Sequence, residues 1–264
     1  MFVFLAFQTA LAADSSHWVN DLHSGFRLIA GPVPGDSGTL RAGVEIRMEP
    51  GWHTYWRYPG DSGVPPRFDF SGSSNLAAAK VRFPAPHLFS DETGKTIGYE
   101  GSVIFPVEVI AKDPRQPVTL RMKINYAVCE KLCLPVEGST ELTLRNGGGT
   151  ENPALAAAEA RVPRPVTAAA IGFTVRRASI GPKPLIAVTL KAPDHPVQLI
   201  AEGPTPDWAL PIPTPVQDAP DGLQHFTFAL DGLPPGVNPN QGPFELTFTV
   251  ITATRAYEIK TRLD

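Results

Sequence analysis

The sequence has few cysteines, few methionines and no basic cluster, and each shortage reduces the range of functions to be expected of the protein. Its 264 residues include two cysteines and three methionines, with a formal net charge of −3. Without a run of Lys and Arg, nucleic acid and anionic membrane surfaces are poor partners. No run of about 20 apolar residues occurs, so no membrane span is expected. The hydrolase motif Gly-x-Ser-x-Gly is also absent, which leaves hydrolysis without support.

Proline and glycine are abundant instead, at 29 and 23 residues, and they separate short apolar runs. This spacing is typical of β-sheet proteins with many turns. Within the runs, apolar and polar residues alternate, as in strands with one buried face. The alternating runs are Val44–Met48, Leu120–Tyr126, Leu142–Arg145, Phe173–Val175, Ile186–Leu190, Phe226–Leu230, Phe244–Val250 and Tyr257–Leu263. We therefore predict an all-β protein.

The runs fall into two groups, which predicts two β-sandwich domains. Residues 1–13 are apolar and end in small residues, as in a secretory signal peptide. Residues 14–147 form the first domain, and residues 148–166, with glycine, an Ala-rich helical stretch and prolines, form a linker. Residues 167–264 form a second, accessory β-sandwich. The signal predicts export to the periplasm, where a disulfide can persist.

The two cysteines, Cys129 and Cys133, are four residues apart and follow an alternating strand. A bridge between them closes a loop so short that it removes only about 2 kcal/mol of unfolded-chain entropy, against about 4.7 for a hundred-residue loop. Residues four apart in an extended strand lie roughly 13 Å apart, so a bridge requires a turn between two strands. Lys131 in that turn would stabilise a thiolate and Glu130 would oppose it. Redox chemistry suits this pair better than mechanical stabilisation.

The segment Gly51–Gly63 is the densest run of aromatic residues, with four aromatics and a histidine within seven positions. It ends in Pro59–Gly63, a strong turn sequence. Two interpretations remain open. The segment is either one strand that buries alternate rings, or an aromatic wall beside the cysteines that limits access of water and oxidants to a thiolate.

Five segments, taken in order, resemble the N-terminal domain of the DsbD-type transmembrane thiol:disulfide reductases, and particularly their ScsB-like relatives. They span roughly residues 40–140, and the ordered set is far more specific than any one motif. The second half is similar to the extra β-domain that longer members carry before their membrane part. The matching segments are Gly51–Trp56, Pro59–Gly63, Phe83–Pro86, Gly98–Gly101 and Val128–Pro135.

The resemblance implies an immunoglobulin-like first domain whose cysteine pair shuttles electrons. Cys129 and Cys133 would be the catalytic pair, and Cys133 would be the sulfur attacked by an incoming thiolate. No metal and no cofactor are implied. Four further residues are expected near the site: Tyr55, Tyr58, Tyr99 and Glu100.

The resemblance also implies partners, namely thioredoxin-like periplasmic oxidoreductases and a membrane electron donor of the DsbD/ScsB type. The protein would then be a component of a protein-disulfide reductase system, with a link to copper tolerance. Two departures from the family pattern stand out. The sequence has neither membrane helices nor a thioredoxin-like C-x-x-C domain, and its cysteine spacing is shorter than the C-x5-C of some members. The electron donor is therefore expected to be another protein.

Two other functions fit the same residues. Cys129 and Cys133, joined in space by His53 or His87, would make a copper(I) site, because copper(I) favours thiolates. Alternatively, the disulfide is structural and the protein is a non-catalytic, protein-binding pair of β-sandwiches. A reduction potential below about −300 mV would favour that structural role.

Overall fold

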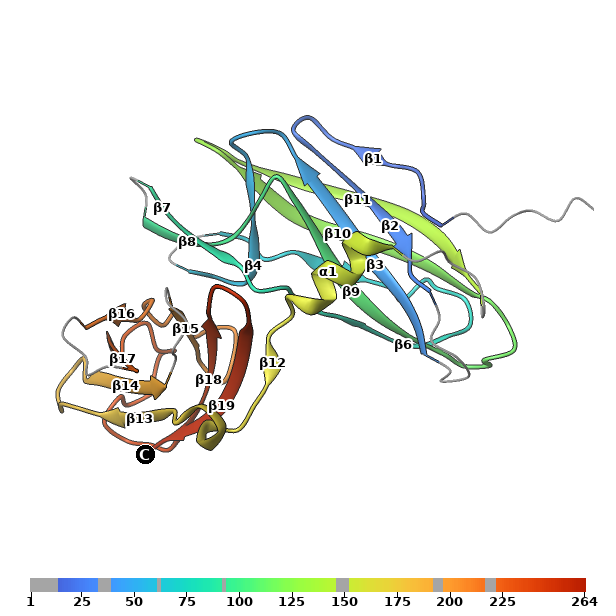
Figure 1. Cartoon of the computed structure of the whole chain (residues 1–264). Helices are drawn as coiled ribbons and strands as arrows, with labels where there is room; N and C mark the ends of the chain where they lie inside the picture. Colours follow the sequence, from blue (N-terminus) through green and yellow to red (C-terminus); the bar gives the residue numbers. More distant parts are fainter. Residues whose placement is uncertain are drawn as a thin grey trace, which may run out of the picture.

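The computed structural model describes residues 14–32, 39–60, 63–91, 94–145, 152–191, 197–216 and 222–264. The predicted signal peptide at residues 1–13, Asp61 and Ser62 of the predicted turn, and the linker glycines at 147–149 lie outside these ranges. Across the described part, the chain forms β-sheets packed in pairs (Figure 1). The predicted all-β sandwich class is confirmed.

The first module, residues 14–145, consists of two antiparallel sheets that pack face to face. One sheet has the strand order β1-β2-β3-β9-β6, and the other has β11-β10-β4-β8-β7 with β5 paired to β10. The strand bounds are β1 Val19–Asn20, β2 Ser24–Ala30, β3 Thr39–Met48, β4 His53–Gly60, β5 Arg67–Asp69, β6 Leu76–Val81, β7 His87–Asp91, β8 Gly94–Glu100, β9 Ser102–Ala111, β10 Val118–Cys129 and β11 Cys133–Leu144.

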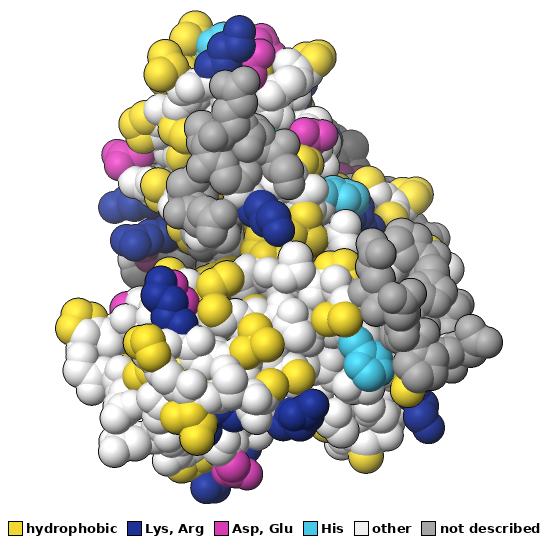
Figure 2. Space-filling model, turned by 90° about the vertical axis from the view of Figure 1, so that its left-hand side faces the viewer, with side chains coloured by type: hydrophobic (Ala, Val, Ile, Leu, Met, Phe, Trp, Pro, Cys, Tyr) yellow, Lys and Arg dark blue, Asp and Glu magenta, His cyan; other side chains and the backbone are white. Residues whose placement is uncertain are grey.

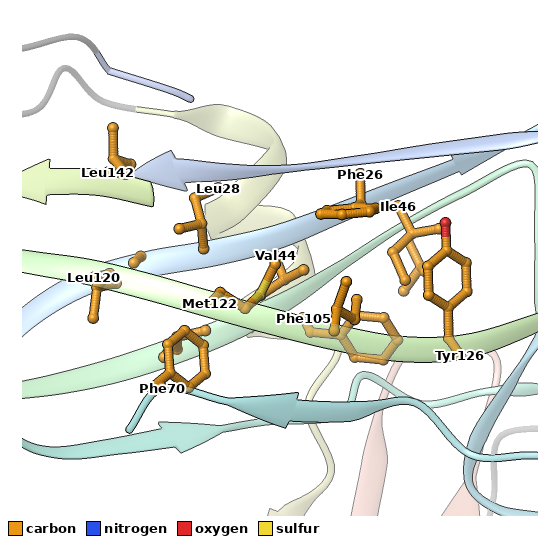
Figure 3. Close-up of a cluster of buried hydrophobic side chains, with 14 of the residues drawn as sticks. Phe26, Leu28, Val44, Ile46, Phe70, Phe105, Leu120, Met122, Tyr126 and Leu142 are labelled. Carbon is orange, nitrogen blue, oxygen red and sulfur yellow. The ribbon is translucent and has the colours of Figure 1, made fainter. Parts of the chain in front are cut away.

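Alternation along the strands builds the core between these sheets. Leu120, Met122 and Tyr126 of β10 point toward Phe26 and Val44 of the opposite sheet (Figure 3). Each large apolar side chain buried in this way contributes about 2 kcal/mol through the hydrophobic effect. The hydroxyl of Tyr126 is not left unpaired, because it lies 2.8 Å from Ser24 Oγ. The alternation predicted for β10 is therefore confirmed residue by residue.

The second module, residues 164–264, repeats the sandwich with shorter strands. One sheet has the order β12-β19-β18-β15 and the other β13-β14-β17-β16. Phe226, Leu246, Phe248 and Ile259 meet in its own apolar core. The bounds are β12 Arg164–Pro165, β13 Thr174–Arg177, β14 Leu185–Lys191, β15 Gln198–Glu202, β16 Thr214–Pro215, β17 Leu223–Ala229, β18 Phe244–Ile251 and β19 Ala256–Leu263, with a 3-10 helix η1 at Ala168–Ile171.

The connection between the modules is ordered where the structure describes it. Helix α1, Pro153–Ala160, starts at Asn152, whose side chain accepts a hydrogen bond from the amide of Leu155. Leu155 is fully buried against Ile29 and Ile104 of the first module. Strand β12 then joins the second module by pairing in parallel with β19. Much of the predicted linker is thus part of the packed structure, although the domain boundaries themselves stay a prediction.

The modules also pack directly against each other. Ile200 of β15 belongs to the core of the first module. Arg57 of β4 makes a bidentate ion pair with Glu202, at 3.0 and 2.7 Å, and a contact of 2.6 Å with Glu258. Burial lowers the pKa of Arg57, but the two carboxylates outweigh it and the net pKa is raised. The two modules therefore share one interface. Figure 2 shows the molecule from the left-hand side of Figure 1, the side on which the second module lies.

Within the described residues, no helix combines the length and the hydrophobicity needed to cross a bilayer.

Candidate functional site

The two cysteines sit at the tip of the β10–β11 hairpin and are joined by a disulfide. Cys129 ends β10, Cys133 begins β11, and the two face each other as the last pair of the register. Their Cα atoms are 4.1 Å apart. The exposed turn Glu130–Leu132 connects them and is closed by a hydrogen bond from the amide of Glu130 to the carbonyl of Leu132. The predicted turn between two strands is present.

The two sulfurs differ in accessibility. Cys129 is buried, with 3% of its surface exposed, whereas Cys133 is exposed. Leu132 beside it is 75% exposed, so the tip presents Cys133 next to an apolar side chain. A nucleophile arriving from solvent therefore meets Cys133 first.

Tyr55 of β4 contacts both sulfurs. Its hydroxyl donates to Cys129 Sγ at 2.8 Å and lies 3.3 Å from Cys133 Sγ. The side chain is buried with Ala127 and Cys129 in a small apolar cluster on the outer face of the sheet, apart from the main core. A hydroxyl in this position stabilises negative charge on sulfur, because a hydrogen bond to the charged form favours that form.

The backbone around β4 fixes the place of Tyr55. His53 pairs with Cys129 across β4 and β10, and Thr54 donates its hydroxyl to the carbonyl of Ala127 at 2.8 Å. Gly63 closes over the ring, since a Cβ there would lie 2.2 Å from Tyr55 Cε1 and its φ is +132°. Only glycine meets both conditions. The backbone conformation of Gly63 and its missing Cβ thus leave room for the ring of Tyr55.

An aromatic row continues from Tyr55 along the outer face of the sheet. The ring of His53 lies edge-on to Tyr55 at 5.5 Å and next to Phe89 at 5.8 Å between centroids. Phe89 in turn lies 6.4 Å from His87. Of the four aromatics in the segment, Tyr55 reaches the sulfurs, and the rest of this row consists of His53, Phe89 and His87, so a wall that limits access to a thiolate stays a prediction. Trp56, the next residue, points the other way and is fully buried in the core.

The other expected site residues lie elsewhere. Tyr58 donates its hydroxyl to the carbonyl of Leu210 at 2.6 Å, in the interface with the second module. Tyr99 donates to the carbonyl of Pro84 at 2.8 Å, and burial raises its pKa well above the usual value. Glu100 is exposed and pairs with His53 across β8 and β4. Among the four, Tyr55 reaches the sulfurs, and Glu100 of β8 lies two strands from β10, which carries Cys129.

Phe89 and Gly63 are neighbours of the site that the sequence did not single out as such. Phe89 follows a proline-rich, largely apolar stretch, and no sequence signal marks it as a neighbour of the cysteines. Gly63 belongs to a motif whose sequence predicts an ordinary turn. Only the family resemblance, which includes both this motif and the segment of Tyr55, connects the two.

Metal ligands do not cluster in the described part of the chain. No group of three or more His, Cys, Asp or Glu residues there is arranged to hold a metal ion. His53 is adjacent to Cys129 in the register, whereas the ring of His87 contacts Arg161, which donates to its Nε2 at 3.2 Å.

Comparison with known proteins finds a family match for the first module. Residues 27–145 match the family described as thiol:disulfide interchange protein DsbD, N-terminal. The crystal structure of the N-terminal periplasmic domain of ScsB from Proteus mirabilis is similar over 95% of this chain and 98% of that chain, with a TM-score of 0.70 and 19% identity. That likeness covers both modules and shows a shared fold.

A yeast GGA1 GAE domain aligns with 48% of this chain and 97% of its own at 12% identity, but its TM-score of 0.27 supports no argument. No curated protein matches the sequence.

Proposed function

Because residues 27–145 belong to the DsbD N-terminal family, we propose that this protein carries out thiol–disulfide exchange at Cys129 and Cys133. The single observation that carries the proposal is the asymmetry of the pair. One sulfur is exposed, the other is buried, and the hydroxyl of Tyr55 contacts both. A purely structural bridge needs neither the exposure nor the hydroxyl.

In the first step, the thiolate of a partner attacks Cys133 Sγ. A bond forms between the partner sulfur and Cys133, the Cys129–Cys133 bond breaks, and its electron pair leaves on Cys129 as a thiolate. Tyr55 donates its hydrogen bond to that buried thiolate, where the low dielectric makes the interaction strong. The leaving sulfur is thus stabilised as its charge develops.

In the second step, another thiolate of the partner attacks the partner sulfur of the mixed disulfide. Cys133 leaves as a thiolate, so the partner dithiol is oxidised to a disulfide and the Cys129–Cys133 pair is reduced by two electrons. Run in reverse, the same steps pass those electrons to a disulfide substrate. The cysteine pair thereby acts as an electron relay between two proteins.

The family supports further details of the proposal. Its members are named for thiol:disulfide interchange, so a thioredoxin-like oxidoreductase is the proposed partner and a membrane protein of the DsbD/ScsB type the proposed electron donor. We place the protein in the periplasm, the compartment named for the similar ScsB domain. The link to copper tolerance stays a prediction.

The test is a pair of single-cysteine variants mixed with a thioredoxin-like partner. The partner lacks its resolving cysteine and carries its remaining cysteine as a thionitrobenzoate disulfide, from which an attacking thiol releases coloured thionitrobenzoate. Cys129→Ser leaves the exposed Cys133, which should displace the dye and trap a mixed disulfide. Cys133→Ser leaves the buried Cys129 and should not react. Equal reaction of both variants, or of neither, would contradict the proposal.

The reduction potential of the wild-type disulfide separates exchange from a structural role. We expect a value less negative than about −300 mV, because structural disulfides lie below it.

A further inference from the structure

A cavity of about 420 Å³ lies where the two modules meet. The first module contributes Ala85–His87 and the second contributes Gln198 and the turn Thr252–Ala256, while Arg161 at the end of α1 closes one side. In Figure 1 the turn between β18 and β19 points at the first module beside the end of α1. Cavities of this size at domain interfaces are common ligand sites.

The charge of the lining has one sign. The charged residues that line the cavity are Arg161 and Arg255, and no Asp or Glu lines it. Some other arginines in the described residues make ion pairs, as Arg27 does with Glu45 and Arg41 with Glu159. By contrast, no ion pair joins Arg161 or Arg255 to a carboxylate in the described residues. The two guanidinium groups are therefore available to an anion from outside.

One of these guanidinium groups is held in place before any ligand arrives. Arg161 Nη2 donates to the carbonyl of Ala85 at 3.1 Å and to His87 Nε2 at 3.2 Å. These two contacts anchor the group and leave further N–H donors of its planar fork for a ligand. Such a fork matches a carboxylate in geometry as well as in charge.

The cavity has room and apolar surface for more than a single ion. Pro86, Ile251 and Ala256 contribute apolar walls beside the amide of Gln198. A second cavity of about 560 Å³ shares Thr252, Thr254 and Arg255 with the first. A ligand that uses both would be elongated, with carboxylates for the arginines and apolar groups for the walls.

We propose that this inter-module groove binds an acidic peptide segment through Arg161 and Arg255. The groove lies near the sulfurs, because His87 pairs with Gly98 and Gly98 pairs with Tyr55 in adjacent strands. With the further spacing from β4 to β10, which carries Cys129, the separation is about 14 Å, which four or five extended residues span. The segment would flank the cysteine of the protein that exchanges with Cys133, and this part of the proposal rests on the proposed function.

The groove is tested first without any thiol. The probe is a fluorescein-labelled hexapeptide of alternating glutamate and leucine, followed by anisotropy with the full wild-type chain at low ionic strength. We expect it to bind about a hundredfold tighter than the same peptide with glutamine for glutamate, because the neutral peptide loses a charge-assisted hydrogen bond to each of the two arginines, and each loss weakens binding about tenfold. Equal binding of the two peptides would overturn the proposal.

Variants then locate the site. Arg161→Gln and Arg255→Gln should each weaken the glutamate peptide about tenfold, while Arg176→Gln, an exposed arginine of β13 outside the groove, should not. Arg255 lies on a turn and serves as the variant least prone to unfold. Loss of affinity in Arg176→Gln as well would mean nonspecific charge attraction. Succinate binding as tightly as the peptide would show that a free carboxylate, not a peptide, is the ligand.

A last measurement tests whether peptide binding in the groove speeds up disulfide exchange at Cys133. A cysteine placed four residues from the glutamates, activated as a thionitrobenzoate disulfide, should react with the reduced wild-type protein faster than its glutamine counterpart, and Arg255→Gln should remove that advantage. If the acidic peptide binds in the groove but gains no rate, the link to Cys133 is wrong while both the groove and the exchange reaction stand.

Discussion

Both modules are sandwiches of two β-sheets, but they differ in whether side chains on the outer face of a sheet are buried. In the second module, β14 alternates strictly between buried and less buried residues, so one face serves the core and the other meets solvent. In the first module, Thr54, Tyr55 and Trp56 of β4 are all buried. Trp56 fills the core, and Tyr55 covers the outer face beside the sulfurs. A reactive pair thus sits on the side of the sheet opposite the core.

This difference separates stability from chemistry. Both cores are built of buried hydrophobic side chains, so both modules should lose stability in the same way when a core residue is truncated. Exchange should depend instead on a few side chains outside either core. The predictions below test that separation.

The largest losses of stability should come from truncating residues in the two cores, and the losses should be similar in the two modules. Leu120 of β10 and Leu246 of β18 are both fully buried. Leu120→Ala and Leu246→Ala should each lower the free energy of unfolding by about 2–5 kcal/mol, from lost burial and the cavity left behind. Chemical denaturation measures this, and the exchange rate of the folded variants should stay at the wild-type value. A slowed exchange in Leu246→Ala would show that the second module takes part in the chemistry.

The next largest loss of stability should come from the interface between the two modules. Arg57→Gln leaves Glu202 and Glu258 without their shared cation in a partly buried place, which should cost about 2 kcal/mol of unfolding free energy. Arg121→Gln is the matched control, because its pair with Glu141 is exposed on both sides and should contribute less than about 1 kcal/mol. Equal losses in denaturation would contradict a special role for the Arg57 network.

The cysteine hairpin and the buried faces of the core strands could be predicted from the sequence. Period-two alternation over Leu120–Tyr126 predicted the buried side of β10, and the four-residue cysteine spacing required the turn at Glu130–Leu132. Local patterns were sufficient here, because the partners in the hairpin are close in sequence and antiparallel strands need only a short turn.

The neighbours of the sulfurs could be predicted only in part. Tyr55 and Tyr58 lie three residues apart in one strand, so which of them faces Cys129 depends on register, and a shift of one residue exchanges the faces. That register is set by the pairing of His53 with Cys129, which spans 76 positions. The partners of Arg57 lie 145 and 201 residues away, and no local pattern announces them.

A smaller effect, confined to chemistry, should come from the hydroxyl of Tyr55. Tyr55→Phe removes the hydrogen bond to Cys129 Sγ and should slow reduction by a small dithiol about tenfold, since a bond to a charged group contributes about 1.5 kcal/mol or more. Tyr58→Phe is the control, because its hydroxyl donates to Leu210 and not to sulfur. Slowing by the same factor in both variants would assign the effect to packing of β4.

The smallest effect concerns the charge at the groove between the modules. Desolvation first, and then the positive charge of Arg161, lower the pKa of His87, while Glu100 acts in the opposite direction. Because the folded state binds this proton more weakly than the unfolded chain, the contribution of His87 to stability is present above its unfolded pKa and is lost as the pH falls through the lower folded pKa. Arg161→Gln should raise the folded pKa toward the ordinary value, leaving the desolvation in place. NMR titration of the imidazole follows this directly, and an unchanged His87 pKa would show that the arginine is too well solvated to govern the groove.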